Sequence, residues 1–337
     1  MAENVIPRAF VWRRLHSLMG LWLVLFLVEH LLTNSQAALW LGEDGRGFIR
    51  MVNAIHNFPY LHLIEIFLLG FPILIHMVWG VKYALTAKSN AKKTDGSAPS
   101  LKKHGRNRAY SWQRITSWIL LFGIIGHVIQ FRFFDYPYIA SQGAKSSYFV
   151  KLEMDNGLYP LAYRLGVSLY DENAVDKEVF SFKQRSDEKS LLEAAKAMDD
   201  DFRFGKSMPS SQFDEQKEMI FQSAEKYRMK AEWIKVLKKI RLKPNQVIAE
   251  SSSFGTVTLL TVRDAFKNPL YLGLYTIFVL AACFHAFNGF WTFLLSWGVL
   301  IRRSAQKSFL VFSLGLIAGV SFLGLAAIWG TWFNLKS

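Results

Sequence analysis

The feature that most restricts the fold of this chain is a set of five long, almost unbroken runs of apolar residues. A membrane span needs about 20 such residues, because a helix rises about 1.5 Å per residue and the hydrocarbon core is about 30 Å thick. The runs are Leu15–Leu32, Leu61–Ala84, Ile115–Phe134, Leu270–Ile301 and Phe309–Trp332. The first run is too long for a cleaved signal peptide, and no small-residue cleavage site follows it. The sequence therefore predicts a multi-pass membrane protein with five transmembrane helices.

The positive charges lie unevenly over the segments that join these runs, and this predicts an orientation. Basic residues crowd three segments: Arg8, Arg13 and Arg14; Lys88, Lys92, Lys93, Lys102, Lys103, Arg106 and Arg108; Arg302, Arg303 and Lys307. The short segment 35–60 instead balances two acidic residues against two arginines. Since short cytoplasmic segments carry the excess of Lys and Arg, the N-terminus is expected in the cytoplasm and the C-terminus outside. The net charge of +14 thus points to membrane lipid, not to nucleic acid.

Composition divides the chain into three parts. Residues 1–135 hold the first three spans and a basic inner loop at 87–110, and residues 268–337 hold the last two spans. Residues 136–267 form an outer insertion whose charges nearly cancel, with 21 Lys and Arg against 19 Asp and Glu. Apolar residues recur at helical spacing in Ser186–Met198 and Phe213–Ile240, whereas Val247–Val262 is rich in Val, Thr and Ser and more typical of strands. Without a nucleotide loop, metal spacing or nucleophile motif, the insertion is interpreted as a docking or capping module.

Four histidines, His30, His76, His127 and His285, lie well inside four consecutive apolar runs. An ionisable side chain at that depth is costly and needs a partner. Because the chain has a single cysteine, electron transfer through it would need a haem, flavin or quinone rather than a cysteine-held cluster. Imidazole is a common haem ligand, and two opposed imidazoles make a six-coordinate electron-carrying haem. Four such ligands predict two b-type haems.

Depth in the membrane predicts which histidines pair on the outer side. His30 lies 16 residues beyond Arg14, and His127 lies 13 residues beyond Arg114. At about 1.5 Å per residue, both sit roughly 20–24 Å from the inner edge. These two histidines are expected to ligate an outer haem.

The remaining two histidines are expected to ligate an inner haem. His76 lies six residues before Lys82 on an inward-going helix, and His285 lies 17 residues before Arg302. A rival pairing uses the 14-residue spacing that separates His16 from His30 and His62 from His76, which keeps side chains near one helix face. It would pair His16 with His76 and His30 with His62, but it leaves the buried His127 and His285 unexplained.

Other polar residues flank the predicted haem sites. Trp12–Ser17 and Trp112–Ser117 both open spans from the inner side, and such residues suit interface anchoring or contacts with haem propionates, with Ser17 and His16 as candidates. On the outer side, Glu29, Glu65 and Gln36 are candidates to line a quinone pocket or pass protons to it. Ordinary hydrogen bonding to a neighbour explains them equally well.

These residues resemble the cytochrome b subunit of succinate:quinone oxidoreductases, specifically the one-subunit, two-haem anchor of bacterial succinate dehydrogenases and menaquinol:fumarate reductases. The resemblance lies in Gly20–His30, in His76 followed by Lys82 and Tyr83, in Tyr110–His127, and in Leu274–Gly298 around His285. It implies an all-α membrane protein, a five-helix bundle with ligand histidines on its first four helices. The first and third histidines would hold the haem farther from the catalytic subunits. The insertion between helices 3 and 4 departs from the family, which has a short connection there.

The resemblance implies an anchor in the bacterial cytoplasmic (inner) membrane that belongs to an enzyme complex but binds no flavin itself. A flavoprotein and an iron–sulfur subunit would dock on its cytoplasmic face. Electrons from succinate would reach a quinone, expected to be menaquinone, and fumarate reduction would run the other way. Two alternatives remain. One is the di-haem b subunit of a formate dehydrogenase or hydrogenase, and the other is a proton-coupled transporter with a histidine relay.

Overall fold

The computed structural model describes residues 6–39, 44–86, 105–142, 145–184, 190, 193, 197 and 211–334. Residues 87–104 of the predicted basic loop, and most of the predicted helix 186–198, lie outside these residues. The chain divides into two compact units. One unit combines residues 1–134 with 265–337, and the other is Asp135–Asp264.

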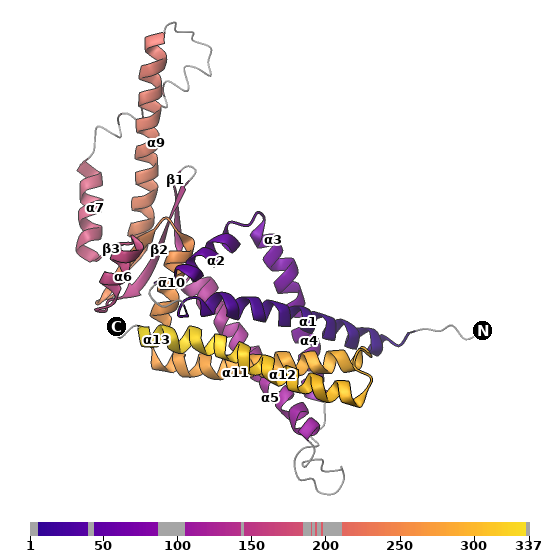
Figure 1. The fold of residues 1–337 in the computed structure, drawn as a ribbon. Helices are drawn as coiled ribbons and strands as arrows, with labels where there is room; N and C mark the ends of the chain where they lie inside the picture. The colour runs from indigo at the N-terminus through magenta and orange to yellow at the C-terminus, as the bar shows by residue number, and fades with distance from the viewer. Residues whose placement is uncertain are drawn as a thin grey trace. The chain divides into compact units, whose positions relative to one another are not determined.

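Among its described residues, the first unit contains five helices that are long and apolar enough to cross a membrane, as the sequence predicts. They are α1 (Arg8–Ser35); α3 (Leu61–Glu65) with η1 (Ile66–Gly70) and α4 (Phe71–Thr86); α5 (Gly105–Ile129) with η2 (Gln130–Phe134); α11 (Pro269–Ser296); and α12 (Arg303–Leu325) with η3 (Ala326–Gly330) and α13 (Thr331–Asn334). A short helix, α2 (Arg46–His56), follows the first span. Within this unit α1, α11 and α12 pack against one another, while α4 packs on α1 and α5 on α11 (Figure 1).

Two predicted boundaries are wrong. The loop 87–110 ends earlier, because α5 already begins at Gly105 and carries Arg106 and Arg108 in its first turn. The fourth apolar run continues to Ile301, but its helix ends at Ser296. Gly298 adopts a positive φ of 75°, the left-handed conformation that commonly follows the last turn of a helix.

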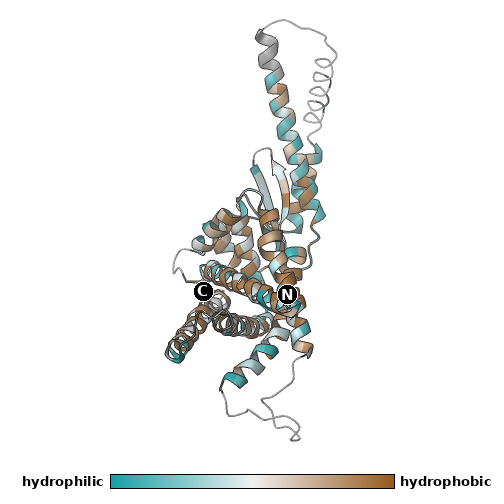
Figure 2. Cartoon of the chain, turned by 90° about the vertical axis from the view of Figure 1, so that its right-hand side faces the viewer, coloured by the Kyte–Doolittle hydropathy of each residue, from teal (hydrophilic) through white to brown (hydrophobic). Residues whose placement is uncertain are grey.

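The spans expose apolar side chains that a soluble protein would cover. Phe67 is 65% exposed, Phe122 68% and Val311 70%. The spans are predominantly apolar, whereas the coloured part of helix α9 (Ser211–Lys239) of the other unit alternates between hydrophobic and hydrophilic residues (Figure 2). Such exposure fits helices whose outer faces contact lipid.

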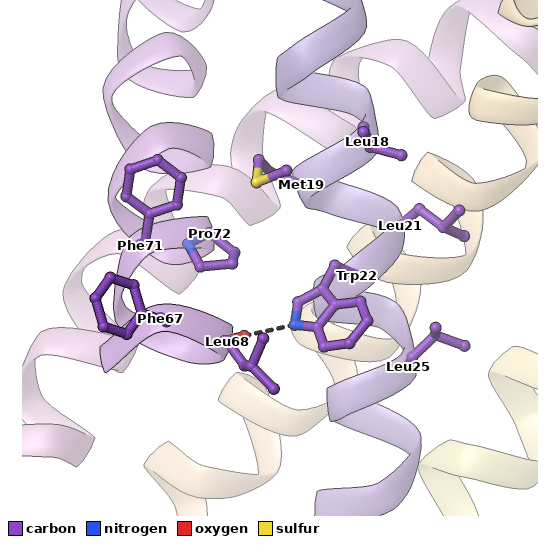
Figure 3. A pocket seen from close by; sticks show the side chains of 9 residues that line it. All are labelled: Leu18, Met19, Leu21, Trp22, Leu25, Phe67, Leu68, Phe71 and Pro72. Carbon is purple, nitrogen blue, oxygen red and sulfur yellow. Dashed lines mark hydrogen bonds between the residues drawn. The ribbon is translucent and has the colours of Figure 1, made fainter. Parts of the chain in front are cut away.

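Pro72 shapes the contact between the first two spans. Because proline has no backbone N–H, the carbonyl of Leu68 four residues earlier loses its usual helical donor. The indole Nε1 of Trp22, on α1, donates a hydrogen bond to that carbonyl (Figure 3). The preceding segment η1 is a π-helix, which is the form a helix often takes around such an irregularity. Beside this hydrogen bond lies an apolar cavity of about 340 Å³, lined among others by Leu18, Met19 and Phe71.

The second unit is built on a four-stranded antiparallel sheet, so the prediction of an all-α chain is wrong for this part. The strands are β1 (Tyr138–Gln142), β2 (Lys145–Glu153), β3 (Ser168–Tyr170) and β4 (Gln246–Ser251), in the order β1-β2-β4-β3. Helices α6 (Leu158–Leu165), α7 (Glu172–Gln184), α9 and α10 (Phe254–Ala265) surround the sheet. The helical prediction for Phe213–Ile240 is confirmed by α9.

Side-chain alternation gives this sheet a core on each face. Val150 and Leu152 of β2 point to a core shared with α6 and α10, while Phe149, directly before Val150, points to the other side. There it packs with Trp233 and Leu237 of α9. Successive strand residues point to opposite faces, so two covered faces require apolar residues at nearly every position of a central strand.

The strand-like prediction for Val247–Val262 is correct only in its first half. β4 ends at Ser251, and the hydroxyl of Ser253 then accepts a hydrogen bond from the backbone N–H of Thr256 at 3.2 Å. This is the N-capping interaction that begins a helix, and it starts α10 in spite of the Val and Thr content. In the last turn of α10 the buried Arg263 forms a two-pronged ion pair with Asp155, at 2.8 and 2.6 Å.

Candidate functional site

The four span histidines lie in two pairs, each formed across two helices. His30 of α1 and His127 of α5 have ring centroids 5.9 Å apart and planes at 86°. His76 of α4 and His285 of α11 have ring centroids 6.2 Å apart and planes at 83°. We call these the outer pair and the inner pair, after the orientation predicted from the sequence.

Of the two contacts that the rival pairing requires, the structure contains the one between His16 and His76. His16 stacks on His76 with ring centroids 4.0 Å apart and planes at 9°, so the inner pair has a third imidazole beside it. The other rival partner, His62, has a side chain that is 75% exposed. It lies 3.5 Å from the Glu65 carboxylate and 3.2 Å from the Arg132 guanidinium.

The Nδ1 atoms of three paired histidines face oxygen atoms. His76 Nδ1 lies 3.0 Å from the backbone carbonyl of His16. His285 Nδ1 lies 3.3 Å from the Thr116 hydroxyl, and His127 Nδ1 lies 3.2 Å from the Tyr275 hydroxyl. A carbonyl can only accept, so the His76 proton is on Nδ1. Its Nε2 atom then carries the lone pair that a metal needs.

Side chains of α5 hold the inner pair from one direction. Gln113 donates to the backbone carbonyl of His285 at 3.0 Å and accepts from the Asn288 amide at 2.7 Å. Thr116, one turn farther along and almost fully buried, donates to the Trp112 carbonyl at 2.8 Å. These bonds fix the α11 backbone and the His285 ring relative to α5.

Aromatic rings surround the outer pair instead. Phe26 stacks on His30 with centroids 5.3 Å apart, and Phe131 lies 5.2 Å from His127. Tyr275 and Phe278 of α11 also contact the His127 ring. The outer pair therefore sits in an apolar surrounding with one phenol hydroxyl.

The ring spacing fits a haem iron held from two sides. Metal–imidazole bonds are about 2 Å long, so two imidazoles on opposite sides of one iron have centroids about 6 Å apart. A bare metal ion would need three or more protein ligands, and no suitable group of His, Cys, Asp or Glu occurs among residues that the structure describes. Pairs of histidines instead fit an iron whose equatorial ligands come from a porphyrin.

Glycines and buried polar atoms beside the pairs also fit that group. A Cβ built on Gly20 would lie 2.8 Å from His76 Cε1, so only glycine allows the ring its place. A Cβ on Gly126, next to His127, would meet nothing within 4 Å. On the inner side, His16 Nδ1 and Arg114 Nε are buried without a hydrogen-bond partner. Such donors suit the carboxylates of a haem.

Ser17, the other predicted propionate contact, has protein partners. Its hydroxyl donates to the Arg14 carbonyl at 2.9 Å and accepts from Trp297 Nε1 at 2.9 Å. The Arg14 guanidinium lies over the Trp297 ring and donates to the Ser296 carbonyl. These contacts anchor the start of α1 to the end of α11.

The three candidate quinone residues have separate neighbours. Glu29 accepts a hydrogen bond from the Thr33 hydroxyl at 2.8 Å. Glu65 forms an ion pair with Arg132 at 2.7 Å. Gln36 donates to the Ser35 hydroxyl at 3.2 Å.

Sequence reasoning missed Tyr275 and Gln130, and it placed Thr116 among possible interface anchors or propionate contacts, not beside a paired histidine. Antiparallel register contains the signal for two of them. On α5, Thr116 and His127 are 11 residues apart, and on α11, Tyr275 and His285 are 10 apart. Each separation spans roughly 15–17 Å, so matching Thr116 with His285 places Tyr275 opposite His127.

Comparison with known proteins confirms the resemblance stated from the sequence. The chain is 34% identical over 126 residues to the succinate dehydrogenase cytochrome b558 subunit of Bacillus subtilis (strain 168). The match covers 37% of this chain and 56% of that relative, so the chain spans little more than half of the relative's length. No family model matches the chain, and no solved structure matches it significantly.

Proposed function

We propose that the chain is the haem b membrane anchor of a succinate dehydrogenase complex, carrying electrons between an iron–sulfur subunit and a membrane quinone. The observation that carries the proposal is the pair of His–His contacts across four spans, with three Nδ1 atoms directed at oxygens. Similarity to a succinate dehydrogenase cytochrome b supports the choice of complex. Two haems b are proposed, ligated by His30 with His127 and by His76 with His285.

Different residues would ligate the haem iron, bind the haem carboxylates and exclude water. Haem iron, when bound, supplies a one-electron carrier. His76 presents Nε2 because the His16 carbonyl holds its Nδ1 proton. His16 and Arg114 offer unpaired buried donors to the inner haem carboxylates. The phenylalanines around the outer pair keep water away from that site.

The proposed complex combines the orientation predicted from charge with the partners that the resemblance implies. The N-terminus and the basic segments would lie in the cytoplasm, where a flavoprotein and an iron–sulfur subunit dock. The C-terminus and the second unit would lie outside. Quinone, with menaquinone as the expected type, would react near the outer pair, with Glu29, Glu65 and Gln36 as candidate contacts.

Haem content of the purified full-length chain tests the proposal. A reduced-minus-oxidised spectrum should show a b-type band, and pyridine haemochrome quantification should give two haems per chain. When the flavoprotein and iron–sulfur subunits are expressed with the chain, succinate dehydrogenase activity should co-purify with it. A chain that binds no haem would overturn the proposal and favour the proton-coupled transporter, while a formate- or hydrogen-oxidising partner would favour the other quinone-linked complexes.

A further inference from the structure

Tyr275 occupies a position between the outer pair and the end of α5. Its hydroxyl lies 3.2 Å from His127 Nδ1 and 3.2 Å from Gln130 Oε1. The ring packs edge-on against Phe131, Phe266 and Phe278, with centroids 5.5–6.3 Å apart. Packing on three sides fixes where the hydroxyl points.

Counting protons determines the direction of these hydrogen bonds. A phenol has one proton, and Tyr275 donates it to the Gln130 carbonyl oxygen. Toward His127 the same oxygen can then only accept, so the imidazole proton must sit on Nδ1. Gln130 thus acts through Tyr275 to leave the Nε2 lone pair of His127 free.

The inner pair is supported by a different group. Thr116 uses its proton toward the Trp112 carbonyl and faces His285 Nδ1 with its remaining lone pairs, at 3.3 Å. The logic is the same, but the acceptor is an aliphatic hydroxyl on α5 instead of a phenol on α11. A change at either acceptor should therefore reach one pair alone.

We propose that Tyr275, oriented by Gln130, is a positioning residue that fixes the His127 tautomer and thereby sets the redox potential of the outer haem. The inference rests on the proposed haem function and adds a residue to it. An acceptor at Nδ1–H makes the imidazole a better electron donor, which stabilises ferric over ferrous iron. Removing the acceptor should raise the potential.

Tyr275→Phe tests this with the ring packing retained. In the full-length chain, the ratio of ferrous to ferric outer haem should rise about tenfold at fixed ambient potential. This corresponds to a midpoint potential about 59 mV higher. The inner haem should keep its potential. Thr116→Val is the mirror control and should shift the inner haem only. Redox titration followed by optical and electron paramagnetic resonance spectra measures both, and the signal lost in His127→Ala identifies the outer haem.

Equal shifts of both haems, or no shift in either, would contradict the role of Tyr275. If Tyr275→Phe fails to accumulate, Gln130→Leu decides instead, because the phenol proton then loses its acceptor and the phenol oxygen becomes a weaker acceptor for His127 Nδ1–H. That variant should also raise the outer potential alone, and an unchanged outer potential would overturn the proposal. Absence of haem from the unmodified chain would be a failure of the proposed function and is seen before any variant is made.

Discussion

The outer and inner histidine pairs consist of the same residue type but are supported by different neighbours. The inner pair lies among hydrogen-bonding groups: the His16 carbonyl, the Thr116 hydroxyl and the Gln113 amide. The outer pair lies among phenylalanine rings, with Tyr275 as its hydrogen-bonding neighbour. Because the two sets of supporting residues do not overlap, each pair should respond to substitutions independently.

Replacing the paired histidines should give the largest effect and the sharpest separation. His30→Ala and His127→Ala should each lose one haem per chain and retain the other, because removal of one of its two axial ligands weakens the binding of that haem. His76→Ala and His285→Ala should lose the inner haem and retain the outer one. Haemochrome quantification with low-temperature spectra distinguishes the two classes.

His62→Ala serves as the matched control, because this exposed histidine faces Glu65 and Arg132. Both haems should remain. Retention of two haems in His127→Ala together with a loss in His62→Ala would instead establish the rival pairing.

Substitution of Gly20 should disturb the inner pair by crowding. In Gly20→Ala the new Cβ would lie 2.8 Å from His76 Cε1, closer than such atoms approach, so the ring must move. Movement would break its bond to the His16 carbonyl, and inner-haem occupancy should fall about tenfold. The outer haem should stay.

Gly319→Ala is the comparison variant for that experiment. Gly319 lies on α12, in the span without a predicted ligand, and a Cβ there would meet nothing within 4 Å. Its haem content should equal that of the unmodified chain. Equal losses in the two glycine variants would show a general packing defect, not crowding at His76.

The smallest predicted effect concerns acid and falls on His56, at the end of the short helix α2. Burial lowers the pKa of His56 below its ordinary value of 6.5, with His62 and Arg132 adding to the decrease and Glu65 opposing it. The unfolded chain therefore takes up this proton first as the pH falls through 6.5, so folded-state stability declines below that pH. His56→Gln should reduce the acid-induced fall in Tm by at most about 2 °C. A thermal scan series in detergent from pH 7.5 to 5.5 measures it, and an identical fall in both proteins would contradict the role of His56.

The spans and the candidate ligands could be predicted because the bilayer imposes a simple rule. Twenty apolar residues make a span, and a histidine such as His127 inside one stands out without any tertiary information. The similar separations of His30 from Arg14 and of His127 from Arg114 likewise agree with the contact between the two rings.

The supporting residues and the second unit were harder to predict for physical reasons. A tyrosine near a membrane interface is common, so Tyr275 has no signal until helix register is considered. In Val247–Val262, β-branched residues favour a strand. The second half is nevertheless a helix, because Ser253 caps it and its apolar residues pack against one face of the sheet. The pairing of β2 with β4, nearly 100 residues apart in the chain, has no local signature.

The hydrogen bond between Trp22 and the Leu68 carbonyl has a consequence for biogenesis. A carbonyl without a donor in hydrocarbon costs several kcal/mol, and Trp22 supplies the Leu68 carbonyl with a donor that Pro72 cannot provide. The first two spans therefore gain stability by leaving the translocon together, as a helical hairpin. Since α1 also carries His30 and α4 carries His76, that hairpin would bring one member of each histidine pair into the bilayer ahead of α5 and α11.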